Sequence, residues 1–211
     1  MEYLVTMTTH VPAGTTDEAV ADVRAREGAH TRELAEQGHV LRLWRPPLSP
    51  GEWRTLGLFA AADGDELERV LASMPLRVWR TDEVTALGPH PNDPGAPRDQ
   101  AAGERPPGTE YLTVFTVVIP DGTPAEVVEE ATRGEARSAQ QLGEQGHLVR
   151  LWGLPSDDDA LHTLGLWRAE DDAQLTGMLE ALPLDPWMTV QTTPLTPHPS
   201  DPGVSTSSTT R

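Results

Sequence analysis

The 211-residue chain contains no cysteine and no lysine. Without cysteine there can be no disulfide, no thiolate catalysis and no cysteine-based zinc site. Without lysine there can be no Schiff base on a lysine amine. All sixteen basic residues are therefore arginines.

Positive charge is scarce, and the formal net charge is −17. A nucleic-acid-binding protein normally presents a basic face, and acidity this strong disfavours anionic membrane surfaces. No apolar run approaches the roughly 18 residues of a membrane span. The N-terminus lacks the basic and apolar regions of a signal peptide. We expect a cytoplasmic protein that binds neither nucleic acid nor membranes.

Motifs for metals and cofactors are also missing. The seven histidines are scattered, with no HExxH and no clustered His/Asp spacing. No P-loop, GxGxxG or GxSxG motif occurs. The sequence predicts no metal site and no cofactor, and leaves a small-molecule substrate as the expected partner.

The chain does contain an internal repeat. Residues 2–95 and 110–203 align without a gap at a constant offset of 108, and about two in five aligned positions are identical. The repeat is too long for a solenoid unit of about 20–50 residues and has the size of a small domain. We predict repeat domains at 1–95 and 110–203, a Pro/Gly-rich linker at 96–109 and a disordered tail at 204–211.

Each repeat has the pattern β-α-β-β-α-β. Turn residues, acidic helix starts and alternating apolar positions mark the boundaries. In the first repeat the pattern predicts strands at 3–11, 39–45, 53–61 and 78–87, with helices from Thr15 or Thr16 to Gln37 and from Asp63 to Ser73. The second repeat predicts the corresponding elements at 111–119, 123–145, 147–153, 161–169, 171–181 and 187–195.

This order predicts an α+β fold. Two β-α-β units around an antiparallel sheet, with both helices on one face, give the ferredoxin-like arrangement. Two such domains can cover each other's bare sheet faces, as in dimeric α/β-barrels. We therefore expect an intrachain pseudo-dimer, and further homo-oligomers remain open.

Glu27 and its repeat partner Glu135 are the first candidate catalytic residues. Each falls on the apolar stripe of its first helix. Burial raises the pKa of a carboxyl and a nearby arginine lowers it, and a raised value suits a general base. The alternative is a carboxylate at the margin of the stripe in a structural ion pair.

Arg42 and Arg150 lie in the middle of apolar strands, and alternation places Arg42 on the face of Val40 and Trp44. Such an arginine could hold a substrate carboxylate or neutralise a developing enolate. It could instead pair with Glu27 or stack on Trp44. Trp44 and Trp152 themselves could line an apolar pocket, fill the core or pack between the two repeats.

Two pairs of histidines are kept in both repeats. His39 and His147 begin the second strand, where they could shuttle protons or merely cap the strand. His90 and His198 lie in a PHP segment after the last strand. This segment could fold over a site and offer its histidine, or act as a rigid packing element.

The motifs carry a family resemblance. The run MPLRVWRTDEVTALGPHP from Met74 and the run LPLDPWMTVQTTPLTPHPSDP from Leu182 resemble the C-terminal signature of muconolactone delta-isomerases. Glu27, followed by EQGHVLRLWR, resembles the helix-glycine-strand segment of that family. The resemblance covers about 90 residues of each repeat.

The resemblance implies ferredoxin-like single domains that assemble into oligomers with sites near subunit contacts. It implies a cofactor-free shift of a double bond in a small lactone of aromatic catabolism. His90 and His198 match the histidine of the His-Pro pair that ends the family's C-terminal signature. The Arg42 position departs from the family, which has a histidine there and an arginine one residue earlier.

The two repeats differ at the start of the third strand. Trp53 and Arg54 in the first repeat correspond to Leu161 and His162 in the second, whereas Thr55 and Thr163 are shared and could donate a hydrogen bond. Trp53, Thr55 and Thr163 join the candidate substrate-binding residues. We expect an isomerase moving a double bond in a small unsaturated lactone or enone. The alternatives are a cyclase or isomerase of specialised metabolism and a non-catalytic binding or scaffold protein.

Overall fold

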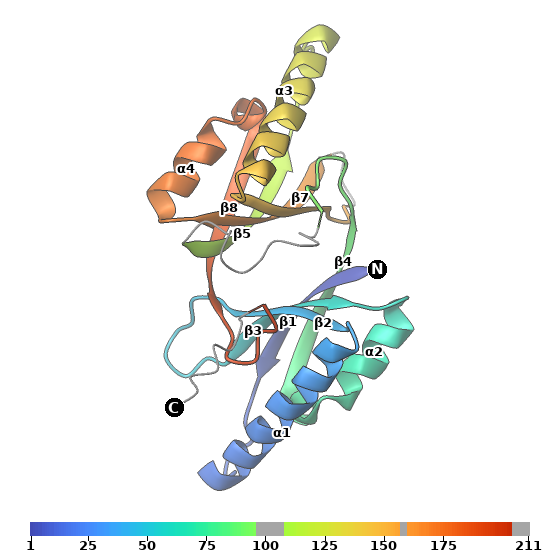
Figure 1. The fold of residues 1–211 in the computed structure, drawn as a ribbon, viewed down its shortest axis with the longest axis vertical. Coiled ribbons are helices and arrows are strands. Elements are labelled where there is room, and N and C mark those ends of the chain that lie inside the picture. Colours follow the sequence, from blue (N-terminus) through green and yellow to red (C-terminus); the bar gives the residue numbers. More distant parts are fainter. Residues whose placement is uncertain (96–107, 157–159, 204–211) are drawn as a thin grey trace. The chain divides into compact units, whose positions relative to one another are not determined.

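The computed structural model describes residues 1–95, 108–156 and 160–203. It contains two compact units (Figure 1). Unit 1 consists of Met1–Leu87 together with the C-terminal segment that begins at Thr196. Unit 2 consists of Gly88–Leu195. The units therefore do not coincide with the sequence repeats, because each repeat ends in a short segment that belongs to the other unit.

The elements follow the predicted order in both repeats. The first repeat forms β1 (Glu2–Thr9), α1 (Asp17–Glu36), β2 (Val40–Arg45), β3 (Arg54–Ala60), α2 (Gly64–Ser73), the 3-10 helix η1 (Pro75–Trp79) and β4 (Arg80–Pro89). The second forms β5 (Thr109–Val117), α3 (Ala125–Glu144), β6 (Leu148–Gly153), β7 (Leu161–Ala169), α4 (Asp172–Glu180), the 3-10 helix η2 (Asp185–Trp187) and β8 (Met188–Pro197).

Local chemistry sets the boundaries of α1. The Thr16 side chain accepts a hydrogen bond from the Ala19 N–H, which makes it the N-cap. Gly38 follows the helix with φ +81°, a backbone conformation that glycine adopts without steric cost. Both predictions are confirmed. The expected strand at 78–87 starts later, because Pro75 opens a 3-10 turn that lasts to Trp79.

Each unit contains one four-stranded antiparallel sheet with two helices. The strand order is β4-β1-β3-β2 in unit 1 and β8-β5-β7-β6 in unit 2. In unit 1, Val5 and Phe59 from the sheet, Leu34 from α1 and Leu71 from α2 share one buried core. Figure 1 shows both helices on one face of the sheet. This is the ferredoxin-like arrangement that the sequence predicts.

The last two residues of β4 and β8 pair outside their own repeat. Pro197 and Thr196 pair with Trp44 and Arg45 on β2 of unit 1. Gly88 and Pro89 pair with β6 of unit 2. Each unit is thus completed by the PHP segment of the other repeat, which sequence periodicity does not reveal.

A bulge changes the alternation on β2 and on β6. The register shifts between Val40 and Arg42, and between Leu148 and Arg150. Val40 and Leu43 both enter the helix-side core, so Val40 does not share a face with Arg42 and Trp44. The strict alternation that we expected for this strand is therefore wrong.

Several expectations concern parts of the chain that the structure leaves undescribed. The predicted linker lies outside the described residues apart from its last two, and β5 already begins at Thr109. The predicted disordered tail at 204–211 also lies outside them. Within the described ranges, no helix combines the length and apolar character needed to cross a bilayer.

Candidate functional site

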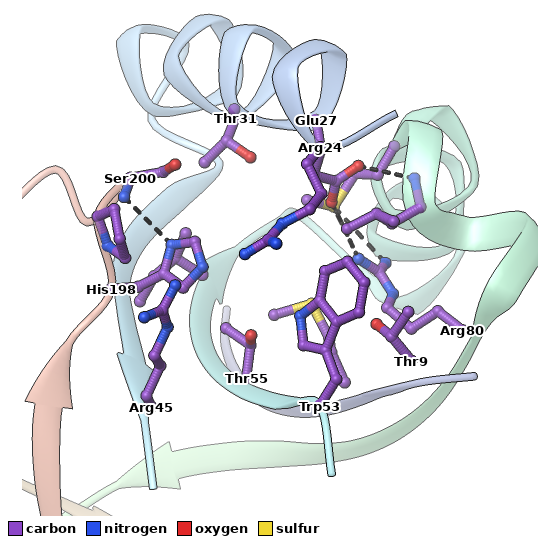
Figure 2. A pocket seen from close by; sticks show the side chains of 16 residues that line it. Thr9, Arg24, Glu27, Thr31, Arg45, Trp53, Thr55, Arg80, His198 and Ser200 are labelled. Atoms are coloured by element: carbon purple, nitrogen blue, oxygen red, sulfur yellow. Dashed lines mark hydrogen bonds and ion pairs between the residues drawn. The ribbon is translucent and has the colours of Figure 1, made fainter. Parts of the chain in front are cut away.

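Unit 1 contains a cavity of about 180 Å³ between α1, the sheet and the C-terminal segment (Figure 2). This is below the roughly 300 Å³ at which sites for drug-sized ligands begin, so it suits a single small ring. Its polar lining comes from several elements: Thr9, Arg24, Glu27, Thr31, Arg45, Thr55, Arg80, His198 and Ser200.

Glu27 reaches this cavity from α1, as the apolar stripe predicted. Its carboxylate accepts a hydrogen bond from the Leu76 N–H at 2.8 Å and pairs with Arg80 at 3.3 Å. Burial raises the pKa of Glu27 above its ordinary value, and the Leu76 N–H and Arg80 only partly offset this. Glu27 is therefore a partly buried carboxylate with a raised pKa, which suits it to accept a proton and return it.

His198 enters the cavity from the C-terminal segment of the other repeat. The Ser200 backbone N–H donates to its Nδ1 at 3.1 Å, as Figure 2 shows. A backbone N–H can only donate, so Nδ1 carries no proton and the neutral ring holds its proton on Nε2. Burial lowers the pKa of His198 to about 4, helped by the positive charge of Arg45. His198 thus offers a neutral N–H donor to a ligand.

This pKa predicts a pH dependence of stability. The unfolded chain takes up a proton near the ordinary pKa of 6.5, whereas the folded protein does so only near pH 4. The stabilisation from neutral His198 is therefore complete above pH 6.5 and is lost as pH falls from 6.5 to 4. In thermal unfolding, the stability of His198→Gln should fall less between pH 6.5 and pH 4 than the stability of the wild type. His10→Gln, at an exposed position, is the control and should keep the wild-type slope. Equal slopes for all three proteins would contradict the prediction.

Three cavity arginines were missed by the sequence reasoning: Arg24, Arg45 and Arg80. Arg80 is 2% exposed and pairs with Glu27 and Asp82. Arg24 stacks over Trp53 at 4.9 Å from the ring centroid. Among the described residues, neither Arg24 nor Arg45 has a carboxylate within ion-pair distance. Their charges are therefore available to an anionic ligand.

Unit 2 contains the corresponding cavity, with a volume of about 200 Å³. Glu135 lies in it and accepts from the Leu184 N–H at 3.2 Å. Burial raises the pKa of Glu135, and the Leu184 N–H partly offsets this. His90 is held by the Asn92 N–H at Nδ1, so it is the same tautomer as His198. Burial also lowers its pKa, and Asp93 opposes this.

The remaining expected substrate residues divide by position. Trp53 and Thr55 line the unit 1 cavity, and Thr163 lines the unit 2 cavity. Trp44 and Trp152 line neither, and both are almost fully buried. Both tryptophans are therefore buried packing residues and do not line a cavity.

Arg42 and Arg150 also lie outside the two cavities. Arg42 Nη2 pairs with Asp201 at 3.0 Å and the guanidinium stacks on Trp44 at 4.8 Å. Asp201 also accepts from the Leu43 N–H at 2.9 Å. Arg150 pairs in the same way with Asp93. Each of these arginines therefore binds the PHP segment of the other repeat, which we call the exchanged segment. Glu27 pairs with Arg80 and not with Arg42.

His39 and His147 are separated from the cavities as well. Their Nδ1 atoms lie 3.1 Å and 2.9 Å from the carbonyls of Ala60 and Arg168. A carbonyl accepts, so Nδ1 carries the proton in both rings, in contrast to His90 and His198. Their observed contacts tie the start of β2 to the end of β3, and the start of β6 to the end of β7. Across residues 1–95, 108–156 and 160–203, no three His, Asp or Glu side chains are grouped to hold a metal ion.

The comparison with protein families identifies the domain type. The model of the muconolactone delta-isomerase family matches residues 1–93 and 109–201. The chain belongs to the muconolactone delta-isomerase family. The muconolactone delta-isomerase of Cupriavidus pinatubonensis is 32% identical over 92 residues, which are 44% of this chain and 97% of that protein. The muconolactone delta-isomerase of Acinetobacter baylyi is 28% identical over 92 residues, 44% of this chain and 93% of that protein.

A solved structure resembles the chain over both repeats. A mutant chlorite dismutase from Candidatus Nitrospira defluvii matches with a TM-score of 0.54 at 13% identity. The match covers 93% of this chain and 92% of that chain. This likeness shows a shared fold only. Within the muconolactone delta-isomerase family, this chain therefore carries two family domains in tandem.

Proposed function

We propose that unit 1 is a cofactor-free isomerase that shifts a double bond in a small unsaturated lactone carrying a carboxylate. The observation that carries this proposal is the convergence on one small cavity of Glu27, His198 and two arginines, Arg24 and Arg45, that pair with no carboxylate in the described part of the chain. The curated relatives are named for an isomerisation of muconolactone, a lactone that retains one carboxylate.

The chemistry needs a base, a carbonyl-binding donor and an anion-binding group. The Glu27 carboxylate removes a proton from the ring carbon at the far end of the unsaturated system. The electron pair of that bond moves to the carbonyl oxygen, where the His198 Nε2–H stabilises the dienolate. The Glu27 carboxyl then returns the proton two carbons away, so the double bond moves and no atom is gained or lost.

Arg24 and Arg45 supply the anion-binding group. Figure 2 shows both side chains reaching toward the cavity, Arg24 from α1 and Arg45 from β2. A guanidinium binds a carboxylate through two parallel hydrogen bonds, which fixes the orientation of the ring. Arg42 acts in this proposal as a positioning residue, because it holds Asp201 and through it the segment that carries His198.

Incubation with muconolactone in D₂O tests this proposal. Proton NMR should show the double bond moving, with deuterium at the carbon that gains the proton in those turnovers in which the Glu27 carboxyl exchanges its proton with solvent. Boiled protein gives the uncatalysed rate. If the native protein neither moves the double bond nor exchanges a substrate proton faster than this control, the proposed function is wrong.

The divergence at the start of the third strand favours one other substrate class. Trp53 lines the unit 1 cavity, whereas Leu161 lines the unit 2 cavity at the aligned position. A cyclase or isomerase acting on a specialised metabolite would explain two differently shaped cavities. Turnover of muconolactone in the D₂O experiment separates this alternative from the catabolic lactone.

A further inference from the structure

The two cavities share their reactive groups and differ in their charges. The shared groups are the pairs Glu27/Glu135, Thr55/Thr163 and His198/His90. At the aligned positions, the three arginines of unit 1 are replaced in unit 2: Arg24 by Thr132, Arg45 by Gly153 and Arg80 by Met188. The unit 2 cavity therefore has a proton-accepting carboxylate, like that of unit 1, but none of the three arginines at the aligned positions.

The walls of the unit 2 cavity are apolar. No arginine lines it among the described residues of the unit. Other substitutions act in the same direction, since Thr9 and Thr31 of unit 1 correspond to Val117 and Ala139. Aromatic and aliphatic side chains form most of its lining, among them Phe115, Ile119, Leu161, Trp167 and Met188.

Part of this apolar lining is also open to solvent. Leu161 is 65% exposed and Ile119 is 39% exposed, although both line the cavity. Exposed apolar side chains beside an apolar cavity favour entry of an apolar ligand. An anionic ligand would lose its hydration here, find no guanidinium and face the Glu135 carboxylate, so it is excluded.

We propose that the unit 2 cavity is a second site, which binds a small uncharged unsaturated lactone or cyclic enone. The His90 Nε2–H donates to the carbonyl of this ligand, and the hydrocarbon ring packs against Phe115 and Trp167. The binding part of the proposal depends on unit 2 alone. Its catalytic part rests on the proposed function of unit 1.

In the catalytic part, the Glu135 carboxylate removes a proton from the ring carbon at the far end of the unsaturated system. The electron pair moves to the carbonyl oxygen, which His90 stabilises, and the Glu135 carboxyl returns the proton to the carbon beside the carbonyl. The double bond moves with atoms and electrons conserved, so no further reactant is required.

A matched pair of probes tests the binding part. β-Angelica lactone has the ring of muconolactone with a methyl group in place of the carboxymethyl group, so it is uncharged. The indole N–H signals of Trp167 and Trp53 report on the unit 2 and unit 1 cavities. We expect β-angelica lactone to shift the Trp167 signal, and muconolactone to shift the Trp53 signal. A β-angelica lactone that leaves Trp167 unchanged up to its solubility limit, or a muconolactone that binds unit 2 as tightly as unit 1, would overturn the proposal.

A charge variant makes this test specific. Met188→Arg introduces the arginine that unit 1 has at the aligned position. It should lower the affinity for β-angelica lactone by roughly tenfold or more, because the apolar wall becomes charged. Thr189→Arg adds the same charge at the neighbouring exposed position and should leave the affinity for β-angelica lactone unchanged. Equal affinities for the two variants would count against the apolar cavity as the binding site.

Deuterium exchange tests the catalytic part. In D₂O, β-angelica lactone should isomerise or exchange its ring proton, and Glu135→Gln should remove this activity. If Trp167 reports binding while exchange is absent, unit 2 is a binding site and the catalytic part is wrong. If muconolactone is not turned over by unit 1 but β-angelica lactone still shifts Trp167, the proposed function fails while the second binding site stands.

Discussion

Glu27→Gln should lower the turnover of muconolactone by about 10²–10⁴-fold, the usual contribution of a general base. Glutamine keeps the size of the side chain, and its carbonyl oxygen can still accept from the Leu76 N–H. Arg80 keeps Asp82 as a partner, so the cavity should retain its shape. We therefore expect kcat to fall much more than KM rises, as measured by steady-state kinetics.

The control for this variant is Glu33→Gln, which changes an exposed carboxylate on the same helix. It should keep the wild-type rate. The double variant Glu27→Gln/Glu135→Gln removes the carboxylate of both cavities. A wild-type rate in the double variant would rule out a glutamate base in either unit.

The pH profile gives a second measurement of the same group. Because burial raises the pKa of Glu27 above 4.5, kcat/KM should rise with pH through an ionisation above that value. The carboxylate is the active form, so the rate is lost on the acid side of this ionisation. This acid limb should be absent from the residual activity of Glu27→Gln.

Asp201→Ala should reduce the free energy of unfolding of unit 1 by about 3 kcal/mol, the lower end for breaking a buried ion pair. The Asp201 side chain is fully buried, and the variant leaves the Arg42 charge and the Leu43 N–H without this partner. The segment that carries His198 should then detach from β2, so the turnover of muconolactone should fall as well. Urea unfolding and amide exchange at Leu43 measure the two structural effects.

Asp93→Ala is the matched variant in unit 2. The Asp93 side chain is 18% exposed, so its removal should cost less than that of Asp201. It should also accelerate amide exchange at Leu151, which donates to Asp93, and not at Leu43. An Asp201→Ala protein with wild-type stability and wild-type exchange at Leu43 would show that the ion pair does not hold the segment.

The fold could be predicted because its signals are local. Thr16 as an N-cap, Gly38 after the helix and the alternation within strands each depend on a few neighbouring residues. The position of Glu27 followed from the same helical periodicity. The bulge after Val40 could not be predicted, because alternation assumes an uninterrupted register.

The completed site depends on contacts between residues far apart in the sequence. Arg42 and Asp201 are 159 positions apart, so no local pattern shows that one holds the other. Arg42, His39 and Trp44 recur in both repeats, and all three make structural contacts. Arg24 and Arg45 do not recur, because the aligned residues are Thr132 and Gly153, so the residues common to both repeats do not include them. Aligned positions where an arginine is lost were the signal that could have found them.

The exchanged PHP segments have a consequence for how this gene can change. In a homodimer, one gene encodes both sites, so every substitution alters the two together. Here the residues of each cavity have their own codons, and the three cavity arginines of unit 1 have no counterparts in unit 2. Each cavity nevertheless takes its histidine from the other half of the gene. The halves are therefore free to diverge in specificity, but neither can be deleted without removing the neighbour's histidine.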